Sequence, residues 1–249
     1  MAGNSWHSPC IDILDMKLND YFERVYIVNL PERRDRRREM QAQLKRINLR
    51  ASFFPAVRVS EAGDWPGLGA RGCFQSHFQI LQKALCSGAR NVMILEDDLD
   101  FSPILQGIEK ELTAMLAAGD WDLLYLGHVE PLPEHSGVKL LPWTEPLMTA
   151  HFYAINGRIL ERLVQFLEFV QARPSGHPLG GPQHYDGALC MFRAQNPDIK
   201  TLIVTPNLGF QRSSRSDISS AWYDRLPLLG HLINAARRLR RLGLAALKA

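Results

Sequence analysis

The sequence of 249 residues has few cysteines and no long apolar run. Its four cysteines (Cys10, Cys73, Cys86 and Cys190) form no Cys-x-x-Cys pair, so the sequence suggests neither a zinc site nor a disulfide framework. No apolar stretch reaches the length that crosses a membrane. The N-terminus lacks the basic-then-apolar layout of a signal peptide. These absences lead us to expect a protein of the reducing cytoplasm.

Acidic residues are missing from the C-terminal end. Segment 227–249 carries a net charge of +5, while the whole chain carries only +3, which leaves about −2 for the rest. Helical spacing puts one set of apolar residues on a single face, largely opposite the arginines: Leu229, Leu232, Ile233, Ala236 and Leu239. Such a segment either lies on an anionic membrane surface or packs on the body with a solvated basic face, and we favour the membrane.

Aromatic residues are also absent from segment 227–249, and the rest of the chain is not basic, so we expect no nucleic-acid partner. The overall composition, with 46 % hydrophobic and 22 % charged residues, is ordinary for a globular protein. We divide the chain into an N-terminal extension (1–23), a main domain (24–225) and a basic amphipathic C-terminal helix (226–249).

Short β-branched runs alternate with segments of helical periodicity. The expected strands span 25–30, 51–57, 91–96, 121–127, 148–156 and 200–206. The expected helices span 33–47, 73–88, 102–118, 157–172 and a short segment from 184, with Ser102 capping the third. Glycines and prolines indicate an open loop over 63–72 and an irregular loop over 173–183. This alternation predicts an α/β fold with a mostly parallel sheet and helices on both faces, in which ligands bind at the carboxyl ends of the strands.

The segment VMILEDDLD (92–100) places carboxylates at such a strand end. Glu96, Asp97 and Asp98 follow an apolar run directly, and like charges this close raise each other's pKa unless a positive charge lies among them. The cluster is either a solvated strand exit or a site for Mg²⁺ or Mn²⁺, which prefer oxygen ligands. Its position at the end of a strand favours the metal site, held by Glu96 and Asp98.

Two further segments have weaker signals. Five arginines follow the first strand, between positions 33 and 38. They either form a solvated helix face, or one or two of them bind a phosphate group through their planar guanidinium groups. The glycine-rich stretch before Cys73 leads into a helix, whose N-terminus can host an anion. His77 in that helix is a core residue, a structural hydrogen-bonding residue or a ligand contact, and taken alone it favours a structural role.

The order and spacing of these motifs resemble glycosyltransferase family 25. An N-L-x-x-R-x-x-R pattern is matched by Asn29, Leu30, Arg33 and Arg36, with Met40 also in place. A G-x-x-G-C-x-x-S-H pattern is matched by Gly69, Gly72, Cys73, Ser76 and His77. An apolar strand ending in E-D-D, the segment AHFYAINGRILERL (150–163) and an aspartate in HYDGAL (184–189) complete a resemblance over about 24–217. One departure is Ala70, where family members often have an acid.

The resemblance implies a GT-A fold, an α/β/α sandwich of Rossmann type. It also implies an inverting transfer of a sugar, commonly galactose from UDP-galactose, to a glycan such as lipopolysaccharide or lipooligosaccharide. The partners would then be a nucleotide sugar, Mn²⁺ or Mg²⁺ and a glycan acceptor, either free or lipid-linked. We expect the protein on the inner face of the cytoplasmic membrane.

The same resemblance assigns roles to residues. Glu96 and Asp98 would hold the metal, with Asp97 near the ribose or supporting the metal. The other donor-binding residues would be Val28, Asn29, Leu30, Arg33, Arg36, His77 and Gln211. Asp186 would be the catalytic base, although it is alternatively a helix-start cap, and loop 173–183 would close as a lid. Gln211, Arg212 and Arg215 would close over the diphosphate, or the segment is simply a polar loop.

Two other functions use the same residues. A metal-dependent phosphohydrolase built on the three acids would release sugar or phosphate without an acceptor. A non-catalytic, membrane-associated adaptor would retain the fold without metal-dependent nucleotide binding, although it would have no need for an intact E-D-D motif.

Overall fold

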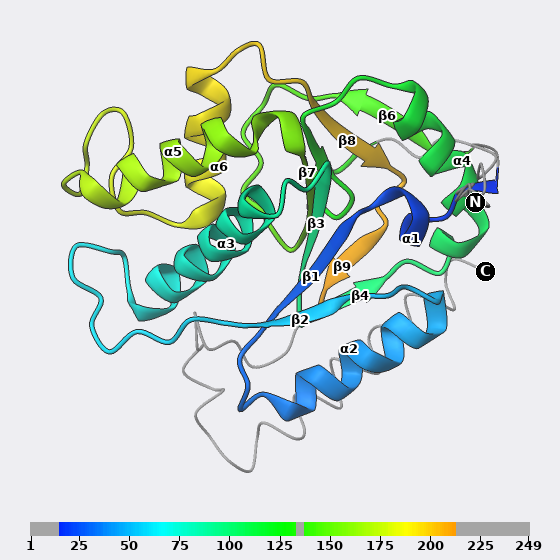
Figure 1. Cartoon of the computed structure of the whole chain (residues 1–249), viewed down its shortest axis with the longest axis horizontal. Coiled ribbons are helices and arrows are strands. Elements are labelled where there is room, and N and C mark those ends of the chain that lie inside the picture. The colour runs from blue at the N-terminus through cyan, green and yellow to red at the C-terminus, as the bar shows by residue number, and fades with distance from the viewer. Residues whose placement is uncertain (1–14, 133–136, 213–249) are drawn as a thin grey trace, which may run out of the picture.

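The computed structural model describes residues 15–132 and 137–212 and contains one central sheet (Figure 1). Its seven strands lie in the order β2-β1-β3-β7-β5-β8-β6. They are β1 (Arg24–Asn29), β2 (Ser52–Pro55), β3 (Asn91–Glu96), β5 (Leu123–Tyr125), β6 (Lys139–Pro142), β7 (Phe152–Asn156) and β8 (Thr201–Thr205). A separate two-stranded ribbon consists of β4 (Leu99–Phe101) and β9 (Gly209–Gln211).

The sheet is mixed but mostly parallel. β2, β1 and β3 pair in parallel, and β5 pairs in parallel with β8. β7 lies antiparallel between β3 and β5, and β6 lies antiparallel at the edge beside β8. Five strands therefore point in one direction, and the carboxyl ends of β2, β1 and β3 meet at one edge. The expected α/β class with a mostly parallel sheet is confirmed.

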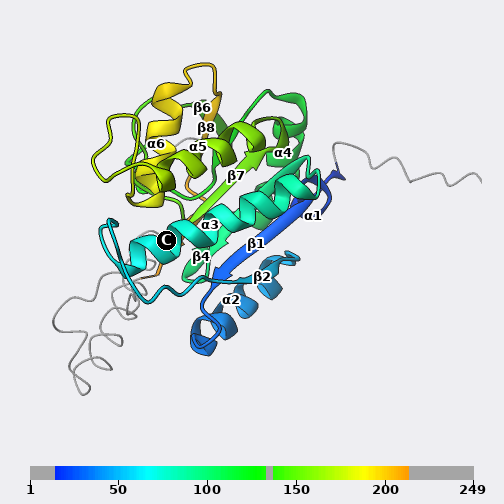
Figure 2. The ribbon, with the colours of Figure 1, turned by 60° about the vertical axis from the view of Figure 1, so that its left-hand side comes forward.

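Helices cover both faces of the sheet (Figure 2). The helices are α1 (Leu18–Tyr21), α2 (Arg34–Ile47), α3 (Leu68–Cys86), α4 (Leu105–Ala118), the 3₁₀ turn η2 (Gly157–Ile159), α5 (Leu160–Ala172) and α6 (Tyr185–Gln195). One core joins α3, α5 and α6 to the sheet, and the other joins α1, α2 and α4 to the opposite face. Successive side chains of β3 point to opposite faces of the sheet, so the strand contributes to both cores. Ile94 packs in the first core, and Met93 and Leu95 pack in the second.

Several expected boundaries are wrong in detail. α3 begins at Leu68, so Gly69 and Gly72 belong to the helix and not to the open loop. α4 begins at Leu105, and the side chain of Ser102 does not cap it. Strands β5 and β7 are shorter than expected, and β4, β6 and β9 were not expected because strands of three or four residues give almost no periodic signal.

The proposed domain limits stay predictions. Leu18 and Phe22, from the predicted N-terminal extension, are buried in the core beneath α4 and β1. The predicted helix over 226–249 lies outside the described residues. Among helices in the described part of the chain, none is long and apolar enough to cross a membrane.

Gly72 allows α3 to lie against the chain that follows β2. A Cβ atom at this position would lie 2.7 Å from the carbonyl oxygen of Val57, which is closer than real Cβ contacts. Gly107 in α4 is exposed, and a Cβ atom added there would have no other atom within 4 Å. The two helical glycines therefore differ in what surrounds them.

We expect Gly72→Ala to lower the free energy of unfolding by about 1–3 kcal/mol through overpacking. Gly107→Ala should raise it by about 0.5–1 kcal/mol, because alanine has the better helix propensity. Urea denaturation of both variants measures the difference. Equal changes in the two variants would contradict the close approach of α3 to Val57.

Candidate active site

A cavity of about 310 Å³ opens where the carboxyl ends of β2, β1 and β3 meet the beginning of α3. Most of the predicted donor and metal residues line it: Val28, Leu30, Arg33, Arg36, His77, Glu96, Asp97, Asp98 and Gln211. Asn29 and Asp186 are the two that do not. The parallel strand ends bring these residues together from five separate segments of the chain.

Arg36 compensates two of the three acids at the end of β3. Its Nη1 lies 3.0 Å from Asp97 Oδ1 and 3.2 Å from Asp98 Oδ2, and all three side chains are almost fully buried. Buried Asn29 donates from Nδ2 to Asp97 Oδ2 at 2.6 Å. Asn29 therefore acts on the cavity through Asp97. The guanidinium predicted to face a phosphate lies instead between two carboxylates.

Glu96 is less well compensated. Gln211 donates from Nε2 to Glu96 Oε2 at 3.0 Å. Among the described residues, the only base within ion-pair distance is His77, whose Nε2 lies 3.9 Å from Glu96 Oε1. Burial, together with the charges of Asp98 and Asp97, raises the pKa of Glu96 to about 8. The carboxyl group is thus poised to accept a positive partner.

Asp98 also has an unused oxygen. Within residues 15–132 and 137–212, no group donates a hydrogen bond to its buried Oδ1. Burial raises the pKa of Asp98, although Arg36 opposes the rise. A buried carboxylate oxygen without a donor, beside a second carboxylate in the same cavity, fits an oxygen-preferring divalent cation.

His77 is held in one orientation inside the core. Its Nδ1 lies 2.8 Å from the hydroxyl of Tyr153, and its ring stacks on Tyr185 at a centroid distance of 4.3 Å. Burial lowers the pKa of His77 to about 3, so the ring is neutral. His77 therefore has the structural role that the sequence favours. The same side chain also lines the cavity.

Arg33 and Asp186 lie at the margins of the site. Arg33 lines the cavity while its guanidinium pairs with Asp35 at 2.9 Å. Asp186 is half-buried in the first turn of α6, where its Oδ1 accepts from the backbone N–H of Gly187. It lies close enough for its charge to contribute to the raised pKa of Glu96, behind burial and the neighbouring aspartates.

Arg212 does not enter the cavity. Its side chain is 10 % exposed and donates to the backbone carbonyls of Asp97 and Leu99, each at 3.2 Å, and it pairs with Asp100. This guanidinium therefore supports the acidic turn from behind, contrary to its expected closure over a diphosphate. Arg215 lies outside the described residues. Loop 173–183 is irregular, as predicted, and does not line the cavity.

Sequence reasoning missed one wall of the cavity. Residues 56–59, which follow β2, line it together with Leu68 and Cys73. The missed signal was topological: β2 pairs in parallel with β1, so the chain leaving β2 must emerge beside the end of β1. Cys73 belongs to the G-C-x-x-S-H motif, and its spacing of four residues from His77 is the signal that places both side chains on one helix face.

No family model matches the chain. A glycosyltransferase 25 family member from Aedes aegypti is 30 % identical over 191 residues, which cover 62 % of this chain and 31 % of that protein. Procollagen galactosyltransferase 1-B from Xenopus laevis is 31 % identical over 200 residues, which cover 64 % and 32 %. The chain is similar to curated members of glycosyltransferase family 25. The resemblance predicted from its motifs is confirmed.

Not every relative is named as an active enzyme. Inactive glycosyltransferase 25 family member 3 from Homo sapiens is 28 % identical over 145 residues, which cover 49 % of this chain and 24 % of that protein. The chain spans less than a third of the length of these three family 25 relatives. Among solved structures, a glycosyltransferase involved in the glycosylation of the major capsid of PBCV-1 aligns with a TM-score of 0.45 and 14 % identity, over 72 % of this chain and 79 % of that one.

The raised pKa of Glu96 predicts how stability depends on pH when chelator is present. Between about pH 4.5 and about pH 8 the folded state retains a proton that the unfolded state has lost, so stability falls as pH rises through this window. Glu96→Gln removes this loss. When the pH is raised from about 5 to about 8.5, we expect the free energy of unfolding of the variant to increase by about 1–3 kcal/mol relative to that of the parent. This is less than the full pKa shift would give, because the side chain is 21 % exposed.

Urea denaturation at the two pH values, in EDTA, measures this difference. Glu168→Gln, at an exposed position on α5, is the matched control and should follow the parent. Parallel stability curves for parent and Glu96→Gln would show that Glu96 ionises normally.

Proposed function

We propose that this chain is a metal-dependent glycosyltransferase that moves a sugar, galactose from UDP-galactose, to a hydroxyl of a cell-surface glycan with inversion. The observation that carries the proposal is the convergence of the E-D-D acids, the end of β1 and the G-C-x-x-S-H helix on one cavity. Its volume of about 310 Å³ lies at the lower end of the range of roughly 300–1,000 Å³ for small-molecule sites. The relatives named as galactosyltransferases support the choice of sugar.

The donor would lie along the strand ends. Val28 and Leu30 form the wall beside β1, where the base and ribose would bind, and Asp97 lies beside them. Arg33 and His77 line the same cavity nearer to α2 and α3. Because Arg36 is engaged with Asp97 and Asp98, its part in our proposal is to hold these acids and add positive charge near the diphosphate.

Glu96 and Asp98 would hold Mn²⁺ or Mg²⁺. Both carboxylates line the cavity, and Asp98 Oδ1 has no donor among the described residues, so the oxygen ligands fit such a cation. When bound, this cation would supply positive charge to the departing diphosphate. Gln211 would keep Glu96 in place through its hydrogen bond to Oε2.

An inverting transfer needs one base, which takes the proton of the acceptor hydroxyl as the sugar carbon is attacked from the opposite side to the diphosphate. We assign this role to Asp186, which is half-buried at the start of α6 and within electrostatic reach of Glu96. Loop 173–183 precedes this residue, and its closure would exclude water from the donor.

The acceptor and the location belong to the same proposal. A lipid-linked glycan such as a lipooligosaccharide precursor would be presented at the inner face of the cytoplasmic membrane, where the basic segment 226–249 would bind anionic lipid. A non-catalytic adaptor is the second candidate, because the names of two relatives, from Homo sapiens and Bos taurus, include the word inactive.

Donor binding tests the proposal first. We expect calorimetry to show UDP-sugar binding in Mn²⁺, tightest for UDP-galactose, and at least tenfold weaker binding in EDTA. The double variant Glu96→Gln/Asp98→Asn should lose the metal-dependent part, while Glu168→Gln should retain it. A folded protein that binds no nucleotide would favour the adaptor, and release of free sugar without acceptor would indicate a hydrolase.

Asp186 gives a second prediction. Asp186→Asn should lower kcat for sugar transfer by roughly 10²–10⁴-fold, because general-base assistance is lost. The donor Kd should stay within about threefold, since Asp186 does not line the cavity. His184→Gln, two residues away and exposed, is the control. An unchanged kcat in Asp186→Asn would leave this residue as part of the helix start alone.

A further inference from the structure

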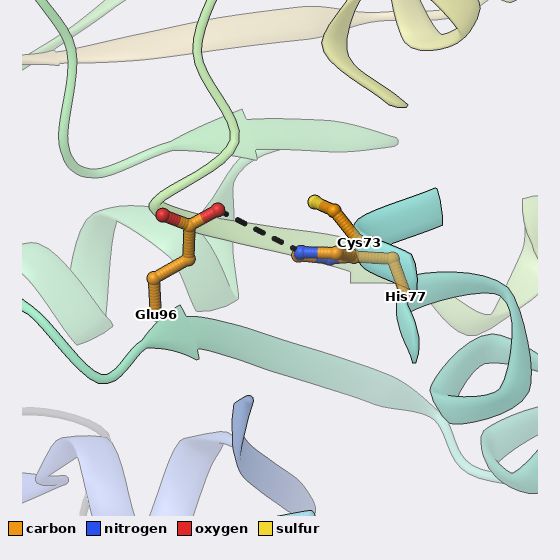
Figure 3. Close-up of side chains that lie close together, drawn as sticks. All are labelled: Cys73, His77 and Glu96. Atoms are coloured by element: carbon orange, nitrogen blue, oxygen red, sulfur yellow. Dashed lines mark ion pairs between the residues drawn. The ribbon is translucent and has the colours of Figure 1, made fainter. Parts of the chain in front are cut away.

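We propose that Cys73, His77 and Glu96 form a binding site for Zn²⁺ on the inner wall of the cavity. Cys73 and His77 project from α3 toward the carboxylate of Glu96 at the end of β3 (Figure 3). One ligand atom from each residue, the Cys73 Sγ, a His77 ring nitrogen and a Glu96 carboxylate oxygen, lies within 4.8 Å of the other two. The separation of His77 Nε2 from Glu96 Oε1 is 3.9 Å.

The sequence spacing and the packing together create this cluster. Cys73 and His77 are four residues apart, so they share one face of α3. That face lies over the carboxyl end of β3, whose last residue is Glu96. The hydrogen bond from Gln211 occupies Glu96 Oε2, and Oε1 is the oxygen that faces His77.

The second observation is the unpartnered nitrogen of His77. The His77 side chain is fully buried, and no group in the described part of the chain bonds to its Nε2. The Tyr153 hydroxyl donates to the Tyr185 hydroxyl at 2.9 Å, so it accepts a hydrogen bond from Nδ1–H of His77. The proton is therefore on Nδ1, and Nε2 directs a lone pair at the cluster. Outer hydrogen bonds of this kind orient histidine ligands in metal sites.

The ligand atoms select the metal. Zn²⁺ accepts sulfur, imidazole nitrogen and carboxylate oxygen in tetrahedral geometry, whereas Mn²⁺ and Mg²⁺ prefer oxygen. Bond lengths of about 2.0–2.3 Å place tetrahedral ligand atoms roughly 3.3–3.6 Å apart. Small rotations of the Cys73 and Glu96 side chains therefore close the site. Binding breaks the S–H bond of Cys73 and the O–H bond of the protonated Glu96 carboxyl group, forms a Zn–S and a Zn–O bond and releases both protons to water. The fourth position would be open to the cavity.

This site is distinct from the Glu96–Asp98 pair but shares Glu96 with it. Its consequence rests on the proposed function: Zn²⁺ would draw Glu96 away from the cation that accompanies the donor diphosphate. Zn²⁺ should then weaken binding of UDP-sugar in the parent chain.

Binding of Zn²⁺ alone, in the absence of nucleotide, tests the site directly. We expect calorimetry of the full chain to show one Zn²⁺ per protein, with affinity at least tenfold weaker in Cys73→Ser and in His77→Gln. Cys86→Ser is the matched control, since Cys86 is an exposed thiol on the same helix, and it should bind like the parent. Asp98→Asn should also retain Zn²⁺, because Asp98 is not a ligand of this site.

Co²⁺ in place of Zn²⁺ provides a spectroscopic readout. A near-ultraviolet thiolate-to-cobalt band should appear in the parent and in Cys86→Ser and be absent from Cys73→Ser. Equal Zn²⁺ affinity in the parent and Cys73→Ser, or no thiolate band in the parent, would overturn the proposal. Cys73→Ser decides the result even if His77→Gln does not fold. Zn²⁺ binding without any nucleotide binding would refute the glycosyltransferase function alone, so the two proposals fail separately.

Discussion

Three carboxylates crowded into one turn, from which most water is excluded, are the constraint on which this site depends. Taking charged groups out of water is costly unless opposite charge and hydrogen bonds compensate them. Arg36 supplies that charge to Asp97 and Asp98, and Asn29 adds a hydrogen bond to Asp97. Glu96 is left with an amide and a neutral imidazole. The turn is therefore stable as a scaffold yet still short of positive charge, which is the property a cation site needs.

The positions of surrounding elements follow from holding this turn. Arg36 can reach the acids because Met40, Leu44 and Ile47 bury one face of α2 against the sheet. From the other side, Arg212 bonds to backbone carbonyls of the turn, and the pairing of β4 with β9 keeps Arg212 there. Gln211, the neighbouring residue, faces the cavity instead. Two consecutive side chains of one segment thus serve opposite sides of the same turn.

A second buried network joins α3 to the rest of the domain. His77 bonds to Tyr153 on β7, and Tyr153 bonds to Tyr185 at the start of α6. These three side chains connect the cavity wall to the helix that carries Asp186. Because the network is fully buried, each member has its orientation set by the others. It gives His77 a fixed tautomer, which is the physical basis for assigning its second nitrogen as a ligand.

Local sequence patterns were sufficient to predict much of the fold and part of the site. The amino-acid sequence by itself determined the alternation of strands and helices and the place of the E-D-D acids at a strand end, because periodicity and strand-end position are local properties. Only the tertiary structure decided that Arg36 compensates two of the acids, that Arg212 lies behind them and that residues 56–59 form a wall. It also brought Cys73 and His77 to Glu96. These are contacts between segments far apart in the chain, and they depend on strand order and helix packing, which the periodicity of a single segment does not specify.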